Sequence, residues 1–300
     1  MKKITYNRFG GTEVLQMTDA PMPEGDIIVK VKAASINPLD WKLWQGDMKL
    51  MSGRKFPKSV GIDFSGIVEQ GSGKYHKGDE VFGITSIFKG GALAEYVAVK
   101  AEDIAHKPGA ITFEEAASLP VAGAAALQIF DKLLKIAPGM QVLINGAGGG
   151  IGPLAIQLAK KAGASVTAVV GPAALEMANS LGSDVVVNYQ KENVLAIGKT
   201  FDAIIDLSGK MTYKAARAIL KKNGIYINTL PSPLEMIRSL FSGGRYKLLV
   251  LKPSAAGLEQ LAATDLKMFI SRRYNFRDYT KAYEEVQKGG IPGKAVFVLN

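Results

Sequence analysis

The residues whose spacing best suits ligand binding form a glycine-rich loop at residues 145–152, NGAGGGIG. Glycine within such a loop lets the backbone approach a pyrophosphate, and glycine at its end lets the next helix pack closely on the preceding strand. The unpaired N–H groups at the start of that helix attract phosphate oxygens. A tight turn that binds no ligand is the alternative interpretation. The predicted cofactor-binding residues of the loop are Ala147, Gly149, Gly150, Ile151 and Gly152.

The type of dinucleotide depends on the end of the next apolar segment, residues 165–171. A site for NADH normally carries Asp or Glu there to hold the ribose hydroxyls. Gly171 occupies that place, so no carboxylate repels a 2′-phosphate, although no cation grips one either. We therefore expect NADPH as the cofactor, with NADH as the alternative. Tyr189 either offers its hydroxyl to that phosphate or packs on a helix.

These positions need a sheet whose strands end side by side. Apolar segments alternate with helix-like amphipathic ones from residue 140 onward, which predicts a parallel sheet covered on both faces. The expected strands are residues 140–146, 165–171, 184–189, 201–209 and 224–230, and the expected helices are residues 151–163, 172–183 and 214–224. Residues 246–254 are a candidate edge strand.

The first hundred residues are instead rich in short β-segments, at residues 26–35, 60–71, 79–88 and 92–103. Short strands separated by turns predict a compact, mostly antiparallel barrel or sandwich, with no helix of any length before residue 113. Pro120 divides the helical stretch that follows. The predicted fold class is α/β, with a doubly wound Rossmann domain at residues 118–262 inserted in a β-rich domain at residues 1–117 and 263–300.

The chain resembles the medium-chain dehydrogenase/reductase superfamily, and within it the zinc-free quinone oxidoreductase-like branch. The matching segments follow one another in order: KAASINPLDWKL, VGIDFSGIVEQG, KGDEVFG, GALAEYV, FEEAASLPVAG, AGGGIGPLAIQLAK, LGSDVVVNY, IIDLSG, LKKNGIY and GKAVFVL. The resemblance implies that the β-rich domain is GroES-like and catalytic. Zinc alcohol dehydrogenases of the superfamily carry Cys and a His-Glu pair where this chain has Pro38, Ile62 and Asp63, so no metal ligand is expected.

The resemblance also implies the catalytic residues, because Asn37 and Asp40 match residues that line the nicotinamide and acceptor pocket. Asn37 can donate a hydrogen bond to negative charge that develops on an acceptor oxygen, and Lys42 can add a positive charge if it points into the cleft. Lys42 equally suits a solvated surface, and Asp40 suits a cap on the turn. Trp41 and Trp44 suit either a flat wall for a planar acceptor or the core.

Further positions match segments that edge the nicotinamide in relatives: Leu207, Ser208, Thr229 and Leu230. Ala125 stands where the family often has Thr, so one polar contact is missing. Relatives are often homodimers paired through an edge strand, and we expect the same here.

Composition excludes several classes of function. The chain of 300 residues has no Cys and only two His, so disulfides, cysteine nucleophiles and zinc–thiolate sites are ruled out. No apolar run reaches the roughly 20 residues that cross a bilayer, and the N-terminus lacks the apolar stretch of a secretory signal, so a cytoplasmic location is expected. Most of the net charge of +10 lies in the second half of the chain.

We therefore expect an NADPH-dependent, zinc-independent oxidoreductase that transfers a hydride to a quinone or an α,β-unsaturated carbonyl. One alternative is an enoyl-thioester reductase of the same superfamily, whose anionic substrate suits the basic residues between Arg238 and Lys252. The other is a catalytically inactive dinucleotide-binding or RNA-binding protein. Nucleic acid is the less expected partner, because the basic residues are not interleaved with aromatics on one strand face.

Overall fold

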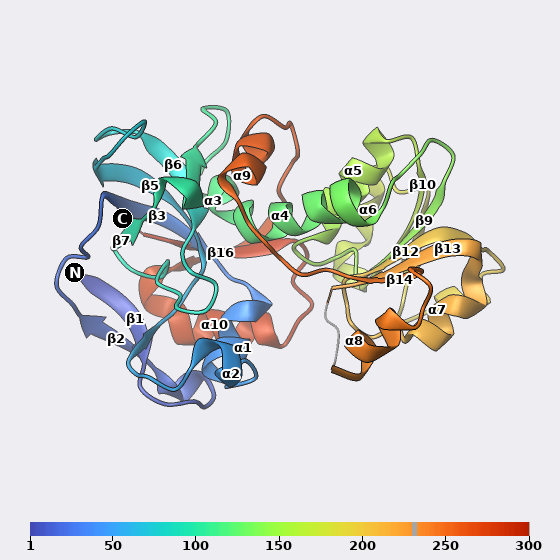
Figure 1. Cartoon of the computed structure of the whole chain (residues 1–300), viewed down its shortest axis with the longest axis horizontal. Coiled ribbons are helices and arrows are strands. Elements are labelled where there is room, and N and C mark those ends of the chain that lie inside the picture. Colours follow the sequence, from blue (N-terminus) through green and yellow to red (C-terminus); the bar gives the residue numbers. More distant parts are fainter. Residues whose placement is uncertain (230–232, 300) are drawn as a thin grey trace.

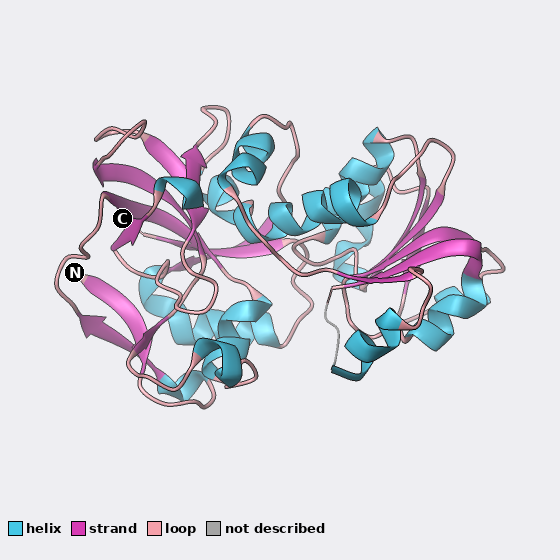
Figure 2. Cartoon of the chain, in the orientation of Figure 1, coloured by secondary structure: helices cyan, strands magenta, loops and turns pink. Residues whose placement is uncertain are grey.

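The computed structural model describes residues 1–229 and 233–299, which form two lobes joined by helix α4 (Pro120–Gln128) (Figure 1). Each lobe is built on its own large sheet, as the strands in Figure 2 show. No helix in these two ranges is long and apolar enough to cross a membrane. The cytoplasmic location stays a prediction.

The first lobe holds a seven-stranded sheet in the order β15-β16-β3-β5-β6-β8, with β7 paired to β3. All its pairs are antiparallel except β15 with β16. The C-terminal strands therefore return to the N-terminal lobe, as the sequence predicts. The strands are β3 (Ile27–Ser35), β5 (Asp63–Gln70), β6 (Glu80–Ile84), β7 (Tyr96–Val99), β8 (Ile104–His106), β15 (Ile270–Asn275) and β16 (Lys294–Val298).

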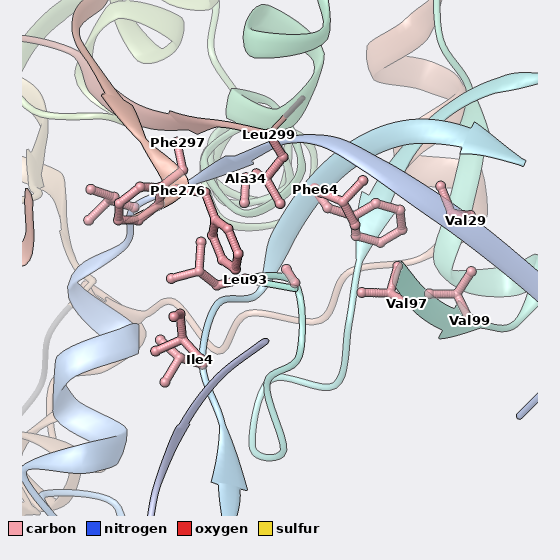
Figure 3. Packing of buried hydrophobic residues seen from close by; sticks show 14 of the residues in the cluster. Ile4, Val29, Ala34, Phe64, Leu93, Val97, Val99, Phe276, Phe297 and Leu299 are labelled. Atoms are coloured by element: carbon pink, nitrogen blue, oxygen red, sulfur yellow. The ribbon is translucent and has the colours of Figure 1, made fainter. Parts of the chain in front are cut away.

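A smaller three-stranded sheet, in the order β2-β1-β4, contains strands that the sequence reading did not identify. They are β1 (Lys2–Tyr6), β2 (Leu15–Asp19) and β4 (Lys58–Ser59). Side chains from both sheets share one apolar core, and Figure 3 shows Ile4 of β1, Val29 of β3, Phe64 of β5 and Phe297 of β16 within it. Burial of such side chains is the main term that holds this lobe together.

Two short helices, α1 (Pro38–Trp44) and α2 (Lys49–Ser52), lie in the region where no helix was expected before residue 113. That expectation is wrong for a local reason. Pro38 at the first helical position has its φ already set for a helix, and Asn37 before it is extended. The Asp40 carboxylate then accepts a hydrogen bond from the Asn37 N–H, at 2.9 Å, which completes the start of α1.

The second lobe is a six-stranded parallel sheet in the order β11-β10-β9-β12-β13-β14. This is the doubly wound order in which ligands bind beyond the carboxyl ends of the central strands. The strands are β9 (Gln141–Asn145), β10 (Ser165–Val170), β11 (Val185–Asn188), β12 (Phe201–Asp206), β13 (Leu220–Asn228) and β14 (Tyr246–Leu248). The short strand β14 is the edge, within the segment predicted for it.

Helices cover both faces of this sheet, with α5 and α6 on one side and α7 and α8 on the other (Figure 1). The helices that follow residue 112 are α3 (Phe113–Ser118), α4, α5 (Gly152–Lys161), α6 (Leu175–Ser180), α7 (Tyr213–Ile219), α8 (Pro233–Leu240), α9 (Ala255–Ala262) and α10 (Tyr279–Gln287). Pro120 separates α3 from α4, as predicted. Helix α7 ends at Ile219, five residues before its predicted end, because Leu220 already pairs with Phe201 of β12.

The fold class is confirmed, since a doubly wound parallel sheet sits between two parts of a β-rich lobe. The exact domain boundaries at residues 117/118 and 262/263 stay a prediction.

Candidate active site

The glycine loop connects β9 to α5, and its glycines differ in whether the fold has room for a side chain at their positions. A Cβ at Gly152 would overlap the carbonyl oxygen of Ala147, so the close approach of helix and strand requires glycine there. A Cβ at Gly149 would have no heavy atom nearer than the Gly146 oxygen, at 3.7 Å. Folding therefore does not demand glycine at 149, whereas a ligand that lies against the backbone would.

The backbone N–H groups of Gly150 and Ile151 have no hydrogen-bond acceptor within the part of the chain that the structure describes. They precede α5, a helix of ten residues whose N-terminus carries a partial positive charge. Unpaired donors at such a position suit the oxygens of a pyrophosphate.

Gly171 and Tyr189 lie side by side at the ends of β10 and β11. A Cβ at Gly171 would be 3.2 Å from a ring carbon of Tyr189 and 3.3 Å from its hydroxyl oxygen. Tyr189 remains 59% exposed, so it is not a core residue. The structure thus brings together the two residues predicted to choose between the dinucleotides.

Asp206, at the end of β12, organises the opposite side of the glycine loop. Its Oδ1 accepts hydrogen bonds from Asn145 Nδ2 at 2.9 Å and from the hydroxyl of Ser208 at 2.7 Å. Its backbone oxygen accepts from the Thr229 hydroxyl at 3.1 Å. Leu207 follows in the same turn, and its N–H donates to the Asn145 oxygen at 2.8 Å.

A Cβ at Gly146 would be 2.9 Å from the Ser208 nitrogen, so this turn lies directly against the glycine loop. The predicted residues Leu207, Ser208 and Thr229 therefore lie together at the carboxyl ends of β12 and β13. Leu230 lies outside the described residues.

Asn37 lies in a buried network in the first lobe. Its Nδ2 donates to Asp63 Oδ2 at 2.9 Å, and its Oδ1 accepts from Lys294 Nζ at 2.8 Å. The Ser35 hydroxyl also donates to Asp63 Oδ2, at 2.9 Å, and the Val121 N–H at the start of α4 donates to Asp63 Oδ1, at 3.1 Å. Burial raises the pKa of Asp63, while Lys294, Asn37 and Ser35 act to lower it.

Asp40 is buried beside this network. Its Oδ2 accepts from the Asn37 N–H and, at 3.2 Å, from the hydroxyl of Tyr283 on α10, whereas its Oδ1 has no hydrogen-bond partner. Burial raises the pKa of Asp40 from 3.8 to about 7, with a further increase from the charge of Asp63. When this carboxyl is protonated, its proton is on Oδ1, because Oδ2 is engaged as an acceptor.

The other residues that the sequence marked near the acceptor pocket lie in different surroundings. Lys42 on α1 is half-buried and makes no hydrogen bond or ion pair with residues 1–229 or 233–299. Trp44 is fully buried and packs edge-on against Tyr283, with ring centroids 4.6 Å apart, so it belongs to the core. Trp41 packs partly buried against the same core. Ala125 is buried in α4.

The two lobes meet where β16 begins. The Gly293 N–H donates to the Gly148 oxygen of the glycine loop at 2.8 Å. A Cβ at Gly150 would be 2.7 Å from the Cδ of Lys294. The glycine loop is thus within contact of the network that holds Asn37.

The residues that the structure adds to the predicted set include Asp63, Lys294, Tyr283 and Asp206. Asp63 and Lys294 lie in segments that carry the family resemblance, VGIDFSGIVEQG and GKAVFVL, but nothing in their spacing links them to Asn37. Asp206 lies inside the predicted strand at residues 201–209 and is the last residue of β12, next to Leu207. Tyr283 lies 243 positions from Asp40 and has no sequence signal that points to the site.

The two histidines lie elsewhere in the first lobe, on either side of Asp79. Their Nδ1 atoms are 3.8 Å (His76) and 4.0 Å (His106) from its carboxylate. Among the described residues, no group of three or more His, Asp or Glu is arranged to hold a metal ion.

Known proteins share both lobes. Residues 23–109 match the alcohol dehydrogenase GroES-like domain, and residues 150–229 match the family described as zinc-binding dehydrogenase. The chloroplast envelope quinone oxidoreductase homolog of Arabidopsis thaliana is 34% identical over 79% of this chain and 77% of its own. The mitochondrial NAD(P)H oxidoreductase RTN4IP1 of Homo sapiens is 32% identical, over 99% of this chain and 88% of its own.

The solved structure of the quinone oxidoreductase from Coxiella burnetii superposes with a TM-score of 0.91 at 32% identity, covering 100% of this chain and 99% of that one. The fold and these relatives together define a two-domain, NAD(P)H-dependent oxidoreductase. The chain belongs to the medium-chain dehydrogenase/reductase superfamily, in its quinone oxidoreductase-like branch. The predicted superfamily and enzyme class are confirmed.

Proposed function

We propose that the protein is an NADPH-dependent, zinc-independent reductase of quinones or α,β-unsaturated carbonyls. The observation that carries the proposal is the glycine loop. The N–H groups of Gly150 and Ile151 have no acceptor among the described residues, and packing within the fold does not require glycine at position 149. These features suit a bound pyrophosphate. NADPH is preferred over NADH for two reasons. Gly171 has no carboxylate to repel a 2′-phosphate on the ribose, and the Tyr189 hydroxyl lies next to Gly171, where it can donate to that phosphate.

The chain's own groups fit the reduction of an electron-poor acceptor. A bound reduced nicotinamide supplies the hydride, so the protein has to position the acceptor and stabilise the negative charge on its oxygen. Asn37 has one N–H directed to Asp63 and a second with only 3.5 Å contacts to Ser35, which leaves that donor for an acceptor oxygen. We assign the added positive charge to Lys42, which has no partner in the described chain.

Asp40 completes this set as the group that holds a proton near neutral pH. Its pKa of about 7 allows this carboxyl to hold or release a proton near neutral pH, as a general acid must. Quinones and enones accept hydride without a metal because they are already electron-poor. Simple ketones and alcohols, which need a Lewis acid, are poor substrates for this site.

The hydrogen-bond donors around Asp63 support zinc independence. Asp63 stands at the position of a ligand in the zinc enzymes, but three hydrogen-bond donors and the nearby Lys294 already surround its carboxylate. Pro38 and Ile62 beside it offer no side-chain ligand. A metal ion would have to displace these donors and approach an ammonium group.

An NADPH oxidation screen tests the proposal. The purified protein is tested with a simple quinone, a short enone and a crotonyl thioester, with NADPH and NADH in parallel. Turnover on the quinone or enone supports the proposal, and turnover on the thioester alone supports the enoyl-thioester reductase. Absence of turnover together with a salt-sensitive RNA gel shift would favour the catalytically inactive alternative.

We also propose that the protein forms a homodimer through the edge of the six-stranded sheet. The edge strand β14 is open to pairing on one side. Large apolar side chains nearby are exposed, including Leu240 at 80% and Phe241 at 85%. Light scattering on the eluted protein tests this, and a monomer at micromolar concentration contradicts it.

A further inference from the structure

Lys294 is the first residue of β16 and lies at the junction of the two lobes. Its side chain is 4% exposed, and its aliphatic part passes Gly150 of the glycine loop. The Gly293–Gly148 hydrogen bond holds this part of β16 against that loop. A buried lysine without a role is rare, because removing an ammonium group from water costs several kcal/mol.

The ammonium group of Lys294 binds the loop that carries Asn37. Nζ donates to the Ile36 oxygen at 3.1 Å and to Asn37 Oδ1 at 2.8 Å, and it lies 3.8 Å from Asp63 Oδ2. Lysine only donates hydrogen bonds, and an ionised carboxylate only accepts them. The two charged groups therefore define which end of the Asn37 amide is oxygen and which is nitrogen.

We propose that Lys294 is a positioning residue that acts through Asn37. It fixes the amide so that its N–H groups face Asp63 and the acceptor side, and it joins this amide to the glycine loop through the contact with Gly150. The assignment of Asn37 as the donor to the acceptor rests on the proposed function. The effect of Lys294 on the amide itself does not.

Two substitutions distinguish the effect of the Lys294 ammonium group from that of its aliphatic part. Lys294→Met keeps a similar stem beside Gly150 and removes only the ammonium group. We expect it to lower kcat/KM for the acceptor about 10- to 100-fold, the range for losing a charge-assisted hydrogen bond, and to change the Kd for NADPH less than about 3-fold. Lys294→Ala also removes the stem, and we expect it to raise that Kd about 3- to 10-fold in addition. Lys288→Met, on an exposed lysine, is the matched control and should change neither quantity.

A double-mutant cycle tests whether Lys294 acts through Asn37. In an Asn37→Ala background, Lys294→Met should lower kcat/KM by less than about 3-fold, because the amide that it positions is gone. A drop of the same size in both backgrounds would overturn the proposal, as would an unchanged kcat/KM in Lys294→Met alone.

A second variant is needed in case Lys294→Met does not fold, because this substitution leaves the buried Asp63 carboxylate without its cation. If the single variant does not fold, the pair Lys294→Met and Asp63→Asn removes both charges and retains an oxygen that accepts from Asn37. We expect the pair to fold and to show the same loss of kcat/KM. A folded pair with wild-type kcat/KM contradicts the positioning role.

A measurement without turnover keeps this inference distinct from the proposed function. In the cofactor-free protein, the side-chain amide of Asn37 should give two well-separated proton resonances by NMR that shift or broaden in Lys294→Met. If the wild-type protein reduces no acceptor but this change occurs, the proposed function fails and the positioning of the amide stands. Identical Asn37 resonances in the two proteins overturn the inference.

Discussion

Replacing Asp40 with Asn should make the free energy of unfolding less dependent on pH. Burial, with Asp63 nearby, raises the pKa of Asp40 from 3.8 to about 7. Between these values the folded protein binds a proton that the unfolded chain releases, so this group stabilises the fold at low pH. The stabilisation is lost as the pH rises toward 7 and above.

The size of the effect follows from the two pKa values. A pKa difference of about 3 corresponds to about 4 kcal/mol between the fully protonated and fully ionised limits. Between pH 5 and pH 8, the linkage relation gives a loss of about 2 to 3 kcal/mol in the wild-type protein that Asp40→Asn should not show. A constant offset is also expected, because the amide of Asn leaves a buried N–H group without a partner.

The assay is urea unfolding of both proteins at pH 5, 6, 7 and 8. At each pH the free energy of unfolding of the wild-type protein is subtracted from that of the variant. The quantity to compare is how this difference changes from pH 5 to pH 8, because the constant offset then cancels. Asp47→Asn, at an exposed position, is the control and should follow the wild-type protein. A difference between Asp40→Asn and wild type that is the same at pH 5 and pH 8 would refute the raised pKa of Asp40.

Three further predictions concern the cofactor and the metal. Gly149→Val should leave the unfolding midpoint near that of the wild-type protein but raise the Kd for NADPH at least about 100-fold. Gly152→Ala should instead destabilise the fold by about 2 kcal/mol or more, because its Cβ meets the Ala147 oxygen. Equal effects of the two substitutions on stability contradict this distinction. Tyr189→Phe should narrow the preference for NADPH over NADH about 3- to 10-fold at low salt, without altering turnover at saturating cofactor, and an unchanged ratio of the two Kd values rules out the contact. Elemental analysis should find no stoichiometric zinc, and chelators should leave turnover unchanged; one zinc per chain with loss of activity on its removal would be the opposite result.

Much of the candidate cofactor site could be predicted from the sequence because its determinants are local. The loop from Ala147 to Gly152 follows an apolar strand and opens an amphipathic helix, so its chemistry is contained in one short segment. The ends of parallel strands meet at one edge, which is why Ser208 and Thr229 could be assigned to the same site. Asn37 and Asp40 were located by resemblance alone.

The proposed acceptor side depends on the tertiary structure. Asp63, Tyr283 and Lys294 come from β5, α10 and β16, and no periodicity or spacing in the chain connects them with Asn37. The sequence also left open whether Asp40 lines the acceptor pocket or caps the turn. The fold shows the cap, and the burial of this side chain beside Tyr283 raises the pKa of its carboxyl to about 7. Local signals determine a turn and the ligand that its backbone can hold. The pKa and the orientation of a side chain depend on which distant residues share its buried volume, and that is settled only when the sheets and helices pack.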